Sequence, residues 1–170
     1  TRSFDYFPQR IKTRDLELKH MDATLSKIGT KLPWDQQVRI VCSLDFARKH
    51  EMSVELPLDK VFDGHCNWKD PILSSFATVQ LPVHKLIELA KVDEFCLSSY
   101  RWANVRSDTL SDGSRVEIPA NYSTYLQQLL KMEASGWVDF ISHRQDAEEV
   151  RTIIGLMGYF YALFPVVPSY

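Results

Sequence analysis

The amino-acid sequence predicts an α/β fold, in which helices flank a parallel β-sheet and a mainly helical N-terminal extension precedes the sheet. Three observations support this prediction. In the second half of the chain, segments alternate in the order strand, helix, strand, helix, strand. The chain of 170 residues is long enough to form one core without disulfides or metals. Its composition, 45% hydrophobic and 25% charged, is typical of a globular domain.

Residues 1–93 are expected to form a helical region that packs on the core. Residues 14–29 carry apolar side chains at helical spacing and end at Gly29. Residues 34–51 fit one helical face, although their apolar centre, VRIVCSL, fits a strand equally well, and we expect a helix there. A long irregular link with short strands follows, and residues 81–92 then indicate a short helix with Pro82 near its first turn.

Residues 94–170 are expected to form the α/β core, and the two regions together one compact unit. Residues 95–100 form a compact apolar strand. The turn sequence SDGS at residues 111–114 separates two short strands and predicts a hairpin. Residues 121–136 place tyrosines, leucines and a methionine on one helical face and end at a glycine.

The remaining elements complete the predicted alternation. Residues 137–141 (WVDFI) form the next strand, and Asp146 with Glu149 has the spacing of a capping box that begins an apolar helix. FPVV, residues 164–167, is the last predicted strand. In parallel sheets ligands bind beyond the carboxyl ends of the strands. The polar loops after the strands at 95–100 and 137–141 are therefore the candidate site.

Composition and charge argue against several classes of function. A net charge of −2 provides no field that would attract nucleic acid or an anionic membrane. The longest nearly continuous apolar stretch, Ile153 to Val167, is shorter than the roughly 20 residues of a membrane span. Three cysteines lie far apart, and Cys42 and Cys96 are predicted to be buried thiols, as in a reducing compartment. We therefore expect a cytoplasmic protein without a membrane span.

Short motifs for metals, nucleophiles and nucleotide cofactors are also missing from the sequence. No histidine or cysteine pair has metal-ligand spacing, and neither a Walker loop nor a GxGxxG motif occurs. There is no GxSxG nucleophile elbow. The sequence therefore predicts no metal and no tightly held nucleotide cofactor.

Residues 95–103, FCLSSYRWA, resemble the tyrosine-x-tryptophan motif that begins fungal heterokaryon-incompatibility (HET) domains. CLSSYR also resembles the first strand of Toll/interleukin-receptor (TIR) domains, with which HET domains are thought to share their fold. The resemblance covers residues 94–167, with Ala103 in place of the usual glycine and SHRQ where HET domains carry CIDQ. Further features of HET domains follow in order and at similar spacing, namely Asp112-Gly113, Asn121, Trp137-Val138-Asp139, Gln145, Glu149, Met157 and Tyr161.

The resemblance implies a TIR-like sheet and one of two functions. One is a signalling or self-defence module of cell death or innate immunity that cleaves the nicotinamide–ribose bond of NAD, with NAD as substrate and no resident cofactor. The other is a non-enzymatic interaction domain or structural subunit that keeps the fold without the site. Either function is expected to involve a homo-oligomer or a signalling partner protein.

Glu149 is the first candidate for the catalytic carboxylate and Glu148 the second. Cleavage of the nicotinamide–ribose bond develops positive charge on the ribose, which a nearby carboxylate stabilises. The alternative for Glu149 is structural, because it also completes the capping box that begins with Asp146 and lies at the positive end of the helix dipole.

Five further residues are candidates for binding the substrate. Arg101 suits a phosphate, Trp102 suits stacking on a base or nicotinamide ring, and Ser99 can donate a hydrogen bond. Asp139 lies within the predicted strand at residues 137–141, and Arg144 follows that strand. Structural roles stay open for all five: an exposed arginine, a tryptophan packed beneath the sheet edge, a small spacer, and a buried carboxylate paired with an arginine.

Overall fold

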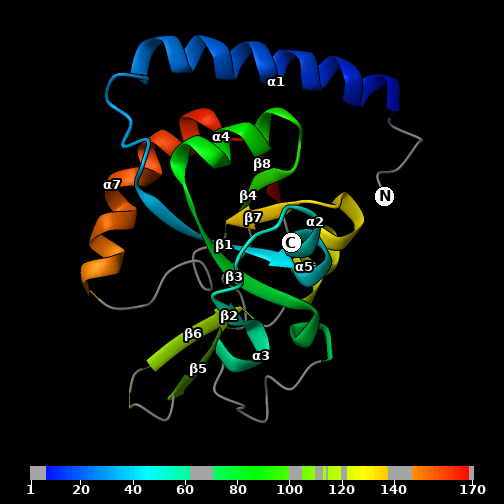
Figure 1. Ribbon diagram of the computed structural model, residues 1–170, viewed down its shortest axis with the longest axis vertical. Helices are drawn as coiled ribbons and strands as arrows, with labels where there is room; N and C mark the ends of the chain where they lie inside the picture. Colours follow the sequence, from blue (N-terminus) through cyan, green and yellow to red (C-terminus); the bar gives the residue numbers. More distant parts are fainter. Residues whose placement is uncertain are drawn as a thin grey trace.

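The computed structural model contains a six-stranded sheet covered by helices and a separate two-stranded hairpin (Figure 1). The prediction of an α/β fold with flanking helices is confirmed, but the sheet is mixed and not wholly parallel. The residues that the structure describes are 7–61, 71–99, 105–109, 113, 115–119, 122–137 and 147–168.

The first half of the chain contains both helices and strands. In chain order these are α1 (Phe7–Ile28), β1 (Gln37–Ser43), α2 (Leu44–Lys49), β2 (Leu56–Pro57), α3 (Leu58–Val61), the 3₁₀ helix η3 (Pro71–Ser75), β3 (Phe76–Pro82) and α4 (Val83–Lys91). The second half contains β4 (Phe95–Ser99), β5 (Val105–Thr109), β6 (Arg115–Pro119), α5 (Tyr122–Met132), β7 (Ser135–Trp137), α7 (Ala147–Leu163) and β8 (Val166–Pro168). The predicted hairpin is confirmed as β5 and β6, which pair antiparallel.

The sheet has an antiparallel half and a parallel half. Its strand order is β2-β3-β1-β7-β4-β8. β3 pairs antiparallel with β1 and β2, whereas β4 pairs parallel with β7 and β8. β1 joins the two halves through its antiparallel pairing with β7. Residues 1–93 therefore supply three strands of the sheet in addition to their helices.

The prediction of a helix over residues 34–51 was wrong, because this segment forms β1 followed by α2. β1 lies between β3 and β7, and the sheet is covered on both faces, so Val41 packs on one face and Ile40 and Cys42 on the other. A strand buried on both faces loses the alternation that would distinguish it from a buried helix. Ser43 then begins α2, with its hydroxyl accepting the amide hydrogen of Phe46 at 3.0 Å.

Two clusters of buried side chains hold the helices on opposite faces of the sheet. α1, α2, α4 and α7 cover one face, where Trp137 packs edge-on against Phe160 and Phe95 against Phe164. α5, α3 and η3 cover the other face, where Cys96 and Tyr125 share a cluster. Aromatic pairs in this geometry contribute about 0.5–1.5 kcal/mol beyond their burial.

The helix-to-strand connections before β4 and β7 follow one pattern. Asp93 and Glu133 follow α4 and α5 with φ of 62° and 52°, in the left-handed region. The next amide in each case donates to a carbonyl five residues earlier, Glu94 to Leu89 and Ala134 to Leu129. This is a Schellman motif, and in both places it leads the backbone from the helix into the parallel strand that follows.

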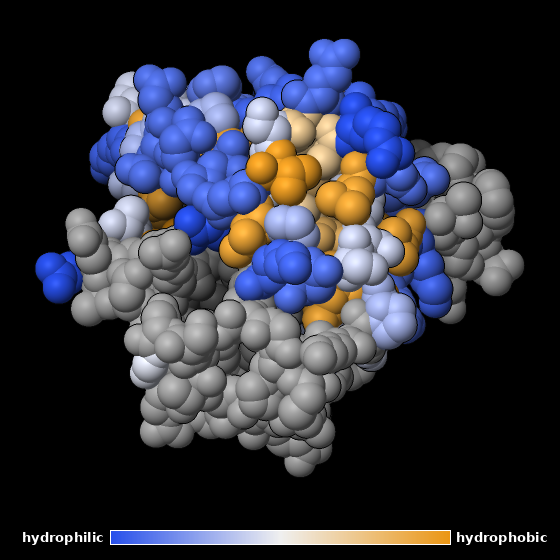
Figure 2. Space-filling model, turned by 60° about the horizontal axis from the view of Figure 1, so that its bottom comes forward, coloured by the Kyte–Doolittle hydropathy of each residue, from blue (hydrophilic) through white to orange (hydrophobic). Residues whose placement is uncertain are grey.

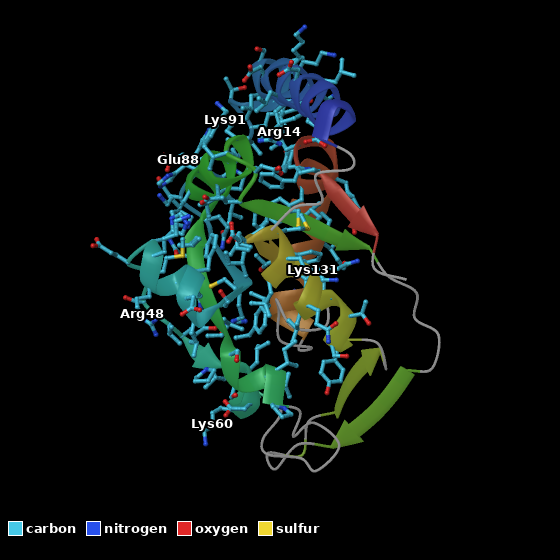
Figure 3. All side chains as sticks on the ribbon, turned by 90° about the vertical axis from the view of Figure 1, so that its right-hand side faces the viewer. Arg14, Arg48, Lys60, Glu88, Lys91 and Lys131 are labelled. Carbon is cyan, nitrogen blue, oxygen red and sulfur yellow. The ribbon has the colours of Figure 1, made fainter. Side chains whose placement is uncertain are left out.

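Two polar side chains of α1 contact carbonyl groups at the carboxyl ends of two other helices. The Arg14 guanidinium donates to the carbonyl of Ala90 in α4, and Nε2 of His20 lies 3.0 Å from the carbonyl oxygen of Ala162 in α7. Figure 3 shows Arg14 and Lys91 at the junction of α1 with α4. Met21, only 1% exposed, anchors the helix in the core. These contacts hold α1 against the last turns of α4 and α7, where carbonyl groups are available as acceptors. The carbonyl of Ala90 also accepts the amide hydrogen of Asp93.

The middle of the sheet has room for a glycine only. Gly136, the central residue of β7, pairs with Val41 of β1 on one side and Cys96 of β4 on the other. A Cβ atom there would overlap the hydroxyl of Tyr125 and lie 3.1 Å from Leu129. That hydroxyl is buried and has no hydrogen-bond partner among the described residues.

We expect Gly136→Ala to lower the free energy of unfolding by about 1–3 kcal/mol, because the added methyl group overpacks the core. Tyr125→Phe should be close to neutral, since it removes a buried hydroxyl that lacks a partner. The double variant should recover most of the loss, because the hydroxyl is the atom in closest conflict. Urea unfolding of the four proteins tests this, and additive effects of the two changes would contradict it.

A carboxylate network joins β1, β3 and the residue before β2. Glu55 accepts hydrogen bonds from Arg39 at 2.5 Å, from the Thr78 hydroxyl at 3.0 Å and from the amide of Gln80. Burial alone raises the pKa of this carboxyl, but the hydrogen bonds and the Arg39 charge outweigh burial and bring its pKa below the ordinary value of 4.5.

A carboxyl with a lowered pKa in the folded state contributes stability above its unfolded value, which is lost as the pH falls through the folded value. Glu55→Gln should therefore flatten the decline of melting temperature below pH 4.5. Asp45→Asn is the control, because the ion pair of Asp45 with Arg48 lies on the open surface. Equal pH profiles for wild type and Glu55→Gln would show that the network contributes nothing through this carboxylate.

Candidate functional site

The three parallel strands bring their carboxyl ends to one edge of the sheet, here called the carboxyl edge. Leu97 of β4 is in register with Trp137 of β7 and with Val166 of β8. Ser99, the last residue of β4, is in register with Pro168 of β8. The segments that follow β4 and β7 therefore start beside each other, as the sequence predicted for the two polar loops.

The start of this arrangement is fixed by Ser135 at the first position of β7. Its amide and its hydroxyl both donate to the carbonyl oxygen of Glu94, at 2.8 and 2.7 Å. Phe95 and Leu97 of β4 are buried on the face of α7, and Cys96 is buried on the face of α5. Strands held on both faces in this way give the carboxyl edge a rigid base.

The connections between these strands produce a topological switch point. The chain passes from β4 to the neighbouring β7 by way of α5 on one face, and from β7 across β4 to β8 by way of α7 on the other face. In doubly wound sheets the first three strands often have this order, and the ligand binds outside the carboxyl ends where the chain reverses direction. In this chain that point lies between β4 and β8.

The structure locates the predicted site residues only in part. Ser99 ends β4 at the carboxyl edge, and Glu148 and Glu149 lie in the first turn of α7. For these three residues the structure describes the backbone. α7 runs from the end of β7 back to the start of β8, so its amino end lies toward the carboxyl edge. The other predicted residues, Arg101, Trp102, Asp139 and Arg144, lie outside the described residues, as does the capping residue Asp146.

The two described cysteines, Cys42 and Cys96, are buried thiols outside any disulfide, as the sequence predicted. Burial raises the pKa of the Cys42 thiol to about 12. Burial, with a smaller effect of Cys96, also raises the pKa of the Tyr125 hydroxyl well above its ordinary value. Cys42 is therefore a poor nucleophile at neutral pH, and Tyr125 a poor general base.

A histidine–carboxylate pair that the sequence did not indicate lies near the start of β4. Nε2 of His50 is 2.9 Å from Oε2 of Glu94, and the Lys49 ammonium is 3.5 Å from the same carboxylate. The His50 ring packs on Phe46 with centroids 4.3 Å apart. The pair lies at the amino end of β4, away from the carboxyl edge. It ties α2 to the sheet, and only the fold brings the two residues together.

Metal ligands and membrane spans were sought among the described residues. Within the ranges given above, no three His, Cys, Asp or Glu side chains are grouped so that they could hold a metal ion. In the same part of the chain, no helix combines the length and the apolar character needed to cross a membrane.

The chain was compared with protein-family models, with curated proteins and with solved structures, and nothing matched in any of the three comparisons.

Proposed function

We propose that the chain is a HET/TIR-like signalling or self-defence module whose carboxyl edge binds NAD and cleaves its nicotinamide–ribose bond. The observation that supports this proposal is the parallel order β7-β4-β8, with crossovers on opposite faces. A sheet of this kind offers a ligand site between β4 and β8. The FCLSSYRWA motif, which carries the resemblance to HET and TIR domains, runs through β4 to that point.

The proposed chemistry requires a carboxylate near the ribose. As the bond to nicotinamide breaks, positive charge develops on the sugar, and a fixed negative charge lowers the energy of that transition state. We assign this role to Glu149, with Glu148 as the second choice. Both lie in the first turn of α7, and the amino end of this helix lies toward the carboxyl edge.

The proposed binding residues come from the segments after β4 and β7. Arg101 binds a phosphate of NAD and Trp102 stacks on a ring, while Ser99 donates a hydrogen bond. Asp139 and Arg144, in the segment after β7, complete the site. We draw the binding residues from both segments because β4 and β7 pair in parallel, so that both segments start at the same edge of the sheet.

The second candidate is a non-enzymatic interaction domain that keeps the fold without the site. The large apolar residues Ile154 and Tyr161 on α7 favour it, because both side chains are exposed on the surface of the helix. Enzyme and interaction domain differ in one measurable property, the release of nicotinamide from NAD.

The decisive experiment incubates the purified chain with excess NAD over a series of protein concentrations and measures nicotinamide by chromatography. We expect release by the wild type and a loss of about 100-fold or more in Glu149→Gln, because a transition-state charge loses its partner. Glu133→Gln is the matched control, since Glu133 lies at the amino end of β7, away from the carboxyl edge. It should retain wild-type activity.

Two outcomes separate the parts of the proposal. If the wild type releases no nicotinamide at any concentration, the enzymatic function is wrong and the interaction domain is favoured. If release occurs but Glu149→Gln and Glu148→Gln both match the wild type, NAD cleavage stands and the assigned carboxylates are wrong.

A further inference from the structure

Large apolar side chains on several elements reach the surface, and Figure 2 shows a group of them bordered by hydrophilic residues on one face of the molecule. Those on α7 form a distinct pattern. Ile154 is 64% and Tyr161 49% exposed, and Arg151 and Gly158 are exposed as well. These four positions recur at three- and four-residue intervals, so they lie on one side of the helix.

Two glycines interrupt this helix, and no contact among the described residues accounts for them. A Cβ atom at Gly155 or Gly158 would meet no atom within 4 Å. Glycine destabilises a helix interior relative to alanine, and no described contact requires it here. A glycine on an exposed helix face does permit another backbone to approach closely.

We propose that this face, defined by Arg151, Ile154, Gly155, Gly158 and Tyr161 and here called the α7 face, binds a second copy of the chain as an antiparallel helix pair. When the two-fold axis passes at the level of residue 156, Ile154 lies opposite the partner's Gly158. In the same register Arg151 lies opposite the partner's Tyr161. The Ile154 side chain then packs in the space above the partner's Gly158. The Arg151 guanidinium lies against the ring of the partner's Tyr161.

The occupant is a second copy because the face is complementary to itself. A two-fold axis repeats each contact, so one register produces two isoleucine–glycine contacts and two arginine–tyrosine contacts. α7 has 17 residues and a length of about 25 Å, so one helix pair makes a small interface and a weak dimer. The dimer goes beyond the proposed function and does not depend on NAD cleavage.

Sedimentation velocity on the full chain, from about 1 to 500 µM, tests the proposal. We expect the average mass of the wild type to rise towards that of a dimer across this range. Ile154→Glu and Gly158→Leu should each raise the dissociation constant about ten-fold or more. Val92→Glu is the matched control, because Val92 is 62% exposed and follows α4. It should associate as the wild type does.

An exchange of side chains identifies the register. Arg151→Tyr and Tyr161→Arg should each weaken association, whereas the double variant should restore it, since the pair then meets with its members reversed. Circular dichroism checks that each variant folds, and Gly158→Leu adds its side chain to open space.

Three results would overturn the proposal. The first is a wild-type chain that stays monomeric over the whole range, even if the α7 face binds a different protein. The second is an Ile154→Glu variant that associates as well as Val92→Glu. The third is a double exchange that associates no better than either single variant.

Discussion

The packing of Tyr125 over Gly136 is the contact on which the joined sheet depends. β7 is the strand that connects the antiparallel half to the parallel half, and Gly136 pairs with a residue of each. α5 covers this junction with a large ring, so the strand beneath it has no space for a side chain. The two halves therefore meet at a strand whose central glycine leaves room for the Tyr125 ring of the helix that covers it.

This junction also determines where a ligand can bind. With β7 fixed beside β1, β4 pairs on its other side and β8 pairs beyond β4. α5 and α7 cover opposite faces, as expected when two crossovers of the same hand run in opposite directions across a sheet. The reversal leaves the carboxyl ends of β4 and β8 without a crossover between them. The same contact that joins the sheet thus also creates the site's position.

Much of the second half could be predicted from the sequence, because each element there has its own local signal. The amphipathic helix, the strand at β4 and the hairpin turn are typical of their classes. The end of that helix was predicted wrongly, because α5 ends at Met132 and Gly136 lies within β7. The elements in the first half of the chain were harder to predict. VRIVCSL is apolar on both faces, and nothing local indicates that β1 crosses the middle of a sheet. Strand order depends on pairings between residues about a hundred positions apart, which periodicity does not record.

The candidate site divides in the same way. That the strands before the two polar loops end at one edge could be predicted, because they were expected to be parallel. The pairing of His50 with Glu94 could not, since their separation in sequence carries no motif. The α7 face was visible only as a dense group of apolar residues; which of them are exposed depends on how α7 packs against the sheet and α1.

The position of α1 has a consequence for biosynthesis. His20 contacts Ala162, and β1 pairs with β7, so α1 and β1 leave the ribosome well before the segments that they pack against. At about 5–20 residues per second, the interval between β1 and β7 is of the order of 5–20 s. During that time the apolar strands β1 and β3 can pair with each other, but the edge of β1 that pairs with β7 stays open. The nascent protein is thus exposed to aggregation until β7 and α7 emerge, and a chaperone that shields the β1–β3 ribbon would improve the folded yield.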